Sequence, residues 1–312
     1  MTVSVHTFED LPYADRLADP AFRALSSPEN RHPTKHTVAF ATMTWAKAHL
    51  LEKAADLDRD ASSFMWLDFG LAHVVTLQPV DWSAIEKTCP ARPRICEMRA
   101  THPEEVADAR EYYRFTRGKV ASGALSVGRP YVAALRRVVH QEVERIIGSG
   151  RVSLEENLYG ALSARHPELF ECWFSDYFGI LRNYVDIIDD IGCVLDNLTY
   201  CRDRGLHERA LQIYHAVHRS LRRGLLCLRP DDFGRLLHDG FITAFYVDRS
   251  LAEQIARRIT AIHRYAPSLR EHLDTPLVRA NLAYVSADLD LPELDWASFA
   301  ALDDFAAWRS CF

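Results

Sequence analysis

The stretch Ser63-Phe64-Met65-Trp66-Leu67-Asp68-Phe69 is the part of this chain that decides its fold, because an apolar, aromatic run ends there in a single acid. The length and the aromatic content of the run are typical of a buried β-strand. In alternating α/β sheets, ligands gather beyond the carboxyl ends of the strands. Asp68 is therefore a candidate ligand-binding residue, and Gly70 after it would allow a close approach of the backbone. A turn aspartate that accepts a local backbone hydrogen bond is the structural alternative.

Strand-like and helical stretches alternate through the part of the chain around this run. We expect strands at Arg94–Met98 and Lys119–Val127 and helices at Thr37–Ala55 and Pro130–Ile147. From Leu181 onward, apolar residues recur every three or four positions, as in amphipathic helices. The sequence therefore predicts an α/β domain over residues 1–180, followed by a mostly helical region over residues 181–312.

The composition limits the classes of function. The chain has 312 residues, a net charge of −6 and 48% apolar residues, which indicates a globular protein and argues against broad nucleic-acid binding. It contains no apolar run long enough to span a membrane, and acids in its first twenty residues argue against a signal peptide. Seven cysteines without a CxxC pair are expected to be reduced thiols. We therefore predict a cytoplasmic protein.

Two acids and a serine mark the start of a helix in the middle of the chain. Ser153 and Glu156 have the S-x-x-E spacing of a capping box, and Glu155 lies beside them. Glutamates at a helix start also suit the positive end of the helix dipole. Either glutamate would act as a general base only if it faced a cleft.

Three further candidates have weaker signals. Lys47 would pair with a phosphate, or be a solvated helix charge, and His73 would be a metal ligand or base, or a partly buried structural histidine. Ser122 and Gly123 belong to a run of small residues that would let a ligand approach the backbone, or would form a strand edge. This run is neither GxGxxG nor a P-loop, so the pattern itself does not predict nucleotide binding.

A set of aspartates offers a second chemistry. Asp186, Asp189 and Asp190 form a D-x-x-D-D pattern that we expect on a helix, with Asp186 and Asp190 on one face. Helical aspartates of this kind bind magnesium diphosphate in class I terpenoid synthases, although the order of the motif is reversed here. A solvated helix face is the alternative.

Four segments of the chain resemble the HtrL/YibB family, also described as WlaTC/HtrL-type glycosyltransferases. They are TWAKAHLLEKA around Lys47, FMWLDFGLAHV around Asp68, the small-residue stretch from Gly118 to Tyr131, and Leu154 to Tyr184 with its HPELF and DYFGIL strings. Together they cover roughly residues 37–184.

The resemblance implies a GT-A-like α/β/α sandwich that transfers a sugar from a nucleotide-sugar to an acceptor that the sequence does not identify. Few residues precede the motif strand, so the N-terminal half of that fold is expected to be abbreviated. By position, Asp68 takes the place of the acid that helps to bind a metal–diphosphate, with Mn²⁺ or Mg²⁺ as the metal. The roles carried over by position are nucleotide binding by Lys47, sugar-site lining by Ser122 and Gly123, acceptor-side acids at Glu155 and Glu156, and a supporting acid at Asp176.

Two alternatives stay open from the sequence. The first is a non-catalytic binding or scaffold protein, in which the C-terminal helices bind a protein partner and the front half is a degenerate transferase. The second is a magnesium-diphosphate enzyme that uses Asp186, Asp189 and Asp190.

Overall fold

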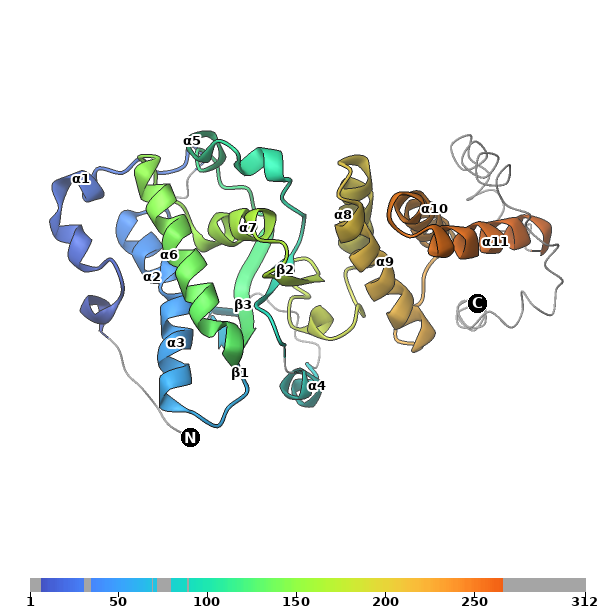
Figure 1. The fold of residues 1–312 in the computed structure, drawn as a ribbon, viewed down its shortest axis with the longest axis horizontal. Helices are drawn as coiled ribbons and strands as arrows, with labels where there is room; N and C mark the ends of the chain where they lie inside the picture. Colours follow the sequence, from blue (N-terminus) through green and yellow to red (C-terminus); the bar gives the residue numbers. More distant parts are fainter. Residues whose placement is uncertain (1–6, 31–34, 69, 72–79, 89, 266–312) are drawn as a thin grey trace. The chain divides into compact units, whose positions relative to one another are not determined.

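The computed structural model describes residues 7–30, 35–68, 70–71, 80–88 and 90–265, and it divides the chain into two compact units, Met1–Leu181 and Arg182–Phe312 (Figure 1). The predicted division lies one residue away, and what each unit does stays a prediction. The first unit is a mixed α/β structure, and the described part of the second unit is helical. The α/β class expected from the sequence is thus confirmed at this level.

A four-stranded sheet of order β1-β3-β2-β4 organises the first unit. The central strand β3 is antiparallel to both of its neighbours, whereas β2 and β4 are parallel. Strands β1, β2 and β4 therefore run in one direction and end at the same edge of the sheet. The strands are β1 (Ser63–Leu67), β2 (Arg94–Glu97), β3 (Val120–Gly128) and β4 (Glu171–Phe174).

Strand β1 covers five of the seven residues of the run that opens the sequence argument. Its side chains alternate, so that Phe64 and Trp66 pack on the core while Leu67 is 40% exposed. The prediction of a strand is confirmed, but a fully buried strand was wrong. Among the described residues β1 pairs only with β3, so it lies at the edge of the sheet and most of its residues are half-buried. Asp68 continues the face of Trp66.

Helices cover the core face of this sheet, and Figure 1 shows α3 beside α6. Helix α3 also packs on β1, and α7 packs on β3. Apolar residues of α6 recur at helical spacing from Val132 through Leu135 and Val139 to Val143, which buries one stripe of the helix. The helices and turns of this unit are η1 (Phe8–Asp10), η2 (Asp15–Ala18), α1 (Pro20–Arg23), α2 (Val38–Trp45), α3 (Lys47–Leu57), α4 (Trp82–Lys87), η4 (Pro103–Val106), α5 (Ala109–Tyr112), η5 (Arg129–Tyr131), α6 (Val132–Gly148) and α7 (Glu155–Arg165).

The helix predicted over residues 37–55 is in fact two helices. Helix α2 ends at Trp45, Ala46 serves as the connection, and α3 begins at Lys47. The break places Lys47 in the first turn of a helix, with its side chain only 3% exposed. The local sequence carries no proline or glycine at this point, so its periodicity gave no sign of the interruption.

The second unit consists of helices joined by short loops. In the described residues they are η6 (Arg182–Tyr184), α8 (Ile191–Asp203), α9 (His207–Arg222), α10 (Pro230–Val247) and α11 (Arg249–Tyr265). Helix α9 is strongly amphipathic and buries Ala210, Ile213, Tyr214 and Val217. No helix in the described part of the chain is long and apolar enough to cross a membrane.

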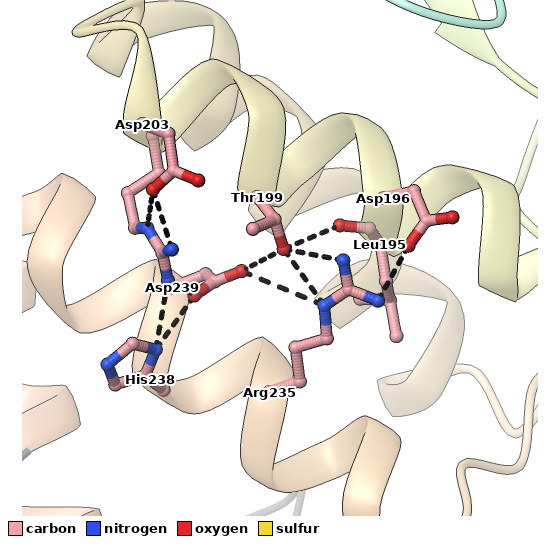
Figure 2. Close-up of polar contacts among 8 residues, drawn as sticks. Leu195, Asp196, Thr199, Asp203, Arg235, His238 and Asp239 are labelled. Atoms are coloured by element: carbon pink, nitrogen blue, oxygen red, sulfur yellow. Dashed lines mark hydrogen bonds and ion pairs between the residues drawn. The ribbon is translucent and has the colours of Figure 1, made fainter.

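A buried polar network joins α8 to α10 (Figure 2). Asp239 of α10 is 1% exposed, and it accepts hydrogen bonds from Thr199 at 2.5 Å and from Arg202. His238 Nδ1 lies 2.8 Å from the same carboxylate, and Arg235 completes the group through Thr199. Asp239 is therefore a buried charge compensated by side chains of both helices.

The cysteine prediction is only partly right. Cys96, Cys172, Cys193 and Cys201 are not disulfide-bonded, as predicted. Cys227 is disulfide-bonded, so the expectation of a reduced thiol at that position was wrong.

Candidate functional site

The ammonium of Lys47 lies at the centre of a cluster that unites most of the candidate residues from the sequence. Its Nζ donates to Asp68 Oδ2 at 3.0 Å, to the carbonyl oxygen of Ser122 at 2.8 Å and to Glu155 Oε1 at 3.1 Å. A lysine this deeply buried needs compensation for the lost hydration of its charge. Two carboxylates and a carbonyl supply it, so the alternative of a solvated helix charge at Lys47 was wrong.

Four different elements bring these groups together. Lys47 begins α3, Glu155 begins α7, Asp68 follows β1, and Ser122 lies in β3. The cluster lies at the sheet edge where β1, β2 and β4 end. This is the edge at which ligands of α/β proteins gather.

Asp68 is held by three contacts but stays partly open to solvent. Its backbone N–H donates to the carbonyl of Gly123 at 2.9 Å, which extends the β1–β3 pairing by one residue. Trp66 Nε1 donates to Oδ1 at 2.5 Å, and Lys47 binds the other oxygen. The side chain of Asp68 is 32% exposed, so the carboxylate is ordered from one side and accessible from the other.

The small-residue run of β3 supplies the floor of the cluster. The pairing of β2 with β3 shifts between Ile95 and Cys96, whose partners are Leu125 and Ala121. Ser122 and Gly123 lie in the β3 segment skipped by this shift, and such bulges re-aim side chains next to functional sites. Ser122 Oγ donates to Glu155 Oε1 at 3.1 Å.

Gly123 and Gly70 differ in their need for glycine. A Cβ on Gly123 would lie 2.8 Å from Leu71 Cδ1 and 3.8 Å from Asp68 Oδ2, so a side chain there would crowd the cluster. A Cβ on Gly70 would meet nothing within 4 Å. The structure thus gives a reason for glycine at Gly123, whereas the space around Gly70 is open and the approach of a ligand to its backbone stays a prediction.

Glu155 is the buried anchor of Lys47. Burial on its own would raise the pKa of this carboxyl, but the ammonium of Lys47, helped by hydrogen bonds, holds the pKa below its ordinary value. Glu155 is therefore ionised at neutral pH. Its chemical role is to position and compensate Lys47.

Glu156 has the opposite electrostatics, although it is the next residue. Burial, and after it the negative charge of Glu155, raise the pKa of Glu156 to about 7. Its Oε2 is buried and accepts no hydrogen bond from the described residues. A carboxyl that is half-ionised near neutral pH is suited to taking up and releasing a proton.

The capping box predicted for Glu156 was wrong. The N-cap of α7 is Leu154, which has no side chain that can cap, and the buried Ser153 hydroxyl makes no hydrogen bond to the described residues. The helix begins one residue later than the S-x-x-E spacing requires. Glu156 is consequently not used for capping, although it keeps its place in the first turn, where an acid suits the helix dipole.

Asp176 stabilises a turn in the loop after β4. Its Oδ1 accepts from the backbone N–H groups of Phe178 at 2.7 Å and Gly179 at 2.8 Å, which fixes a tight turn. The turn holds Tyr177, whose pKa is raised to about 12 by burial and then by the charges of Glu156, Glu155 and Asp68. Asp176 therefore shapes the segment that carries Tyr177.

Sequence reasoning missed two members of the cluster. The indole N–H of Trp66 donates to Asp68, and burial and then the charges of the carboxylates raise the pKa of Tyr177, yet each residue belongs to an aromatic run that is typical of a core. Prediction of a strand at 171–174 would have placed Tyr177, which follows it, at the same sheet edge as Asp68, which follows β1. That strand was not predicted.

The metal-binding expectation can be tested only in part. His73 lies outside the described residues. Among the residues that the structure does describe, no three His, Cys, Asp or Glu side chains gather so as to hold a metal ion. Mg²⁺ sites that use one or two carboxylates together with substrate phosphates do not require such a group.

The charges of the cluster do not balance. One ammonium, Lys47, faces the carboxylates of Asp68 and Glu155, with Glu156 beside them. One negative charge is thus in excess, and ionisation of Glu156 adds a second, which Lys35 partly offsets, so a further cation would compensate the cluster. The accessible face of Asp68 is where such a cation would meet the cluster, so the residues present fit a divalent ion that arrives with phosphate ligands.

The aspartates of the second unit are not arranged as predicted. Asp186, Asp189 and Asp190 lie in the segment before α8 and not on a helix. Asp186 is paired with Arg223 at 2.6 Å and with Arg219 at 3.6 Å, and Asp189 is paired with Arg182. Arginines thus occupy two of the three carboxylates, Asp186 and Asp189, that a magnesium diphosphate would need.

Comparison of the chain with known protein families, with curated proteins and with solved structures found no match in any of the three.

Proposed function

We propose that this chain is a glycosyltransferase that moves a sugar from a nucleotide-sugar donor to a hydroxyl acceptor at the cluster of Lys47, Asp68, Glu155 and Glu156. One observation carries the proposal: a buried lysine joins the carboxylate after strand β1 to Glu155, the acid that begins α7. This cluster holds a fixed positive charge and, one residue from Glu155, a proton acceptor with a pKa of about 7.

The chemistry assigns a different task to each acid. The acceptor hydroxyl attacks the anomeric carbon of the donor, and Glu156 takes the proton of that hydroxyl. A new glycosidic bond forms as the bond from the anomeric carbon to the diphosphate oxygen breaks, and a nucleoside diphosphate leaves with the electron pair. Glu155 stays ionised and keeps Lys47 in place.

The leaving group needs compensation of its charge. A divalent cation bound by Asp68 and by the donor phosphates would supply Lewis-acid stabilisation of the departing diphosphate. Lys47 contributes a fixed positive charge at the same carboxylate, because its Nζ binds the oxygen of Asp68 from the buried side. Trp66 holds the other oxygen, so the carboxylate is oriented before the donor arrives.

The topology is compatible with a GT-A-like unit. The acid follows a strand, β1, whose direction is shared by β2 and β4, and the small-residue strand β3 runs beside it. Only short helical elements precede α3 in the described residues, consistent with an abbreviated N-terminal half.

A thermal-shift screen tests the proposal. The full chain is heated with a panel of uridine-, guanosine- and cytidine-linked sugars, each with and without Mn²⁺. One donor is expected to raise the melting temperature, and Asp68→Ala is expected to abolish that rise. Asp56→Ala, which removes an exposed acid of α3, serves as the matched control and should keep the rise. A chain that responds to no donor would favour the scaffold alternative instead.

A further inference from the structure

A cavity lies in the first unit, at the opposite end of α7 from Glu155 and Glu156. Its volume is about 430 Å³, and it is lined by Pro103, Val106, Arg145, Ala164, Arg165 and His166. This volume falls in the range of small-molecule sites. Arg145 and His166 are 45% and 35% exposed, so the cavity opens onto solvent.

The lining has one apolar and one basic part. Pro103, Val106 and Ala164 form the apolar part, while the three polar lining residues are two arginines and a histidine. Guanidinium groups present paired N–H donors whose geometry matches the oxygens of a phosphate or a carboxylate. An apolar wall with a few polar groups is the usual composition of a ligand site.

A buried acid behind the wall holds the arginines in place. Glu142 is 2% exposed, and its Oε2 lies 3.2 Å from Arg145 Nη1 and 3.5 Å from Arg165 Nε. Tyr113 donates to the other oxygen of Glu142 at 2.6 Å, and Arg165 also donates to the carbonyl of Val106. The arginines are thus oriented by a fixed second layer, which reduces the ordering cost of binding.

The charge of this cavity favours an anion. Two guanidinium groups face one buried carboxylate, and His166 adds a further cation when it is protonated. Two other acids lie near the rim, Glu104 and Glu168, but they are 88% and 75% exposed, so water and salt screen them. Arg145 and Arg165 lie in the last turns of α6 and α7, where a cation also suits the negative end of the helix dipole. The helix dipoles explain the two arginines but not the cavity between them.

We propose that this cavity, walled by Arg145 and Arg165 and backed by Glu142, binds a small molecule that carries a phosphate or carboxylate group beside an apolar body. The anionic group meets the two guanidinium groups, and the apolar body packs on Pro103, Val106 and Ala164. The site lies apart from the Lys47 cluster and does not depend on the function proposed for that cluster.

Calorimetric titration of the full chain with inorganic phosphate and with phenyl phosphate tests this site at fixed, low salt. Both probes are expected to bind saturably, with phenyl phosphate at least about threefold tighter because it also covers the apolar wall. Arg145→Ala is expected to weaken both at least about tenfold, in line with the loss of a charge-assisted hydrogen bond.

The control variant is Arg137→Ala, which removes an exposed arginine from the same helix and should leave both affinities unchanged. Unfolding curves of both variants are recorded alongside, since Arg145 pairs with the buried Glu142, which Arg165 and Tyr113 still contact in Arg145→Ala. Absence of saturable binding, or equal affinity in Arg145→Ala and the parent chain, would overturn the proposal. A carboxylate probe, benzoate, then shows whether the site prefers a carboxylate to a phosphate.

Discussion

Lys47 and Glu155 lie 108 positions apart in the sequence and meet at 3.1 Å, each as the first residue of a helix. The contact joins the start of α3 to the start of α7. Ser122 of β3 binds both side chains, since its carbonyl oxygen accepts from Lys47 and its hydroxyl donates to Glu155. This arrangement fixes the position of the lysine that orients Asp68. The proposed function depends on this arrangement being a site and not only a buried ion pair.

Replacement of the central lysine should cost a large amount of stability. Lys47→Met keeps much of the side-chain volume but leaves Glu155 buried without its cation, and loss of one partner of a buried pair costs about 3–5 kcal/mol. Urea unfolding measures the difference. Lys53→Met, at an exposed position of the same helix, should change the free energy of unfolding by less than about 0.5 kcal/mol. Similar losses in the two variants would show that the Lys47 cluster does not compensate a buried charge.

The raised pKa of Glu156 should appear in the pH dependence of stability. Its pKa rises from an ordinary 4.5 to about 7 on folding, so the folded chain holds this proton more tightly than the unfolded chain. The carboxyl therefore stabilises the fold below pH 4.5, and this contribution is lost as the pH rises through 7. Glu156→Gln cannot ionise, so its stability relative to the parent should grow by about 3 kcal/mol between pH 4.5 and pH 8.

Denaturant unfolding at a series of pH values measures that difference. Glu104→Gln, whose side chain is 88% exposed in the parent, is the matched control and should show no such trend. A difference between Glu156→Gln and the parent that stays constant with pH would contradict the assignment of Glu156 as the proton acceptor.

The strand that carries Asp68 and the small-residue strand were predictable, because hydrophobic runs and glycine are local signals. Their pairing was not, since a register shift such as the one at Ile95 and Cys96 depends on contacts between distant segments. The break at Ala46 is likewise a tertiary effect: no helix-breaking residue marks it, and the buried contacts of Lys47 accompany it.

The sequence pointed to individual residues of the cluster, but it did not predict that they contact one another. A purely structural explanation was open for each of Lys47, Asp68, Ser122 and Glu155. Only the fold brings these residues within hydrogen-bond distance. The capping-box spacing misled for Glu156, because the backbone before α7 places Leu154, and not Ser153, at the N-cap. Capping motifs predict local geometry, which tertiary packing overrides.

Helix packing in the second unit gives a prediction at a glycine. A Cβ on Gly240 of α10 would clash with the buried ring of Tyr214 on α9. Gly240→Ala should therefore destabilise the chain by about 1–3 kcal/mol, since a close-packed interface must shift. Gly192→Ala on α8, where a Cβ meets nothing within 4 Å, should be neutral or stabilise by less than about 1 kcal/mol. Thermal unfolding of both variants gives the comparison, and an equal effect would contradict the close approach.

The stability of the second unit should depend on the charge of Asp239 in the polar network of Figure 2. Asp239→Asn keeps the size of the side chain but removes the charge that faces Arg202 and His238, so we expect a loss of about 3 kcal/mol. Asp203→Asn removes a partner of the same arginine whose side chain is 59% exposed, and it should cost less than about 1 kcal/mol. Chemical denaturation distinguishes the two, and a larger loss for Asp203→Asn would show that Asp239 is not the key acid of the network.

Release of nucleoside diphosphate is the most direct measure of the proposed activity, because water can replace the acceptor. The full chain is incubated with each nucleotide-sugar and Mn²⁺, and the free nucleoside diphosphate is quantified by chromatography. The parent should release it from one donor, and Glu156→Gln should slow the release by about 100-fold or more while donor binding persists. A parent chain that releases no nucleoside diphosphate from any donor, or a Glu156→Gln variant as fast as the parent, would contradict the transferase assignment.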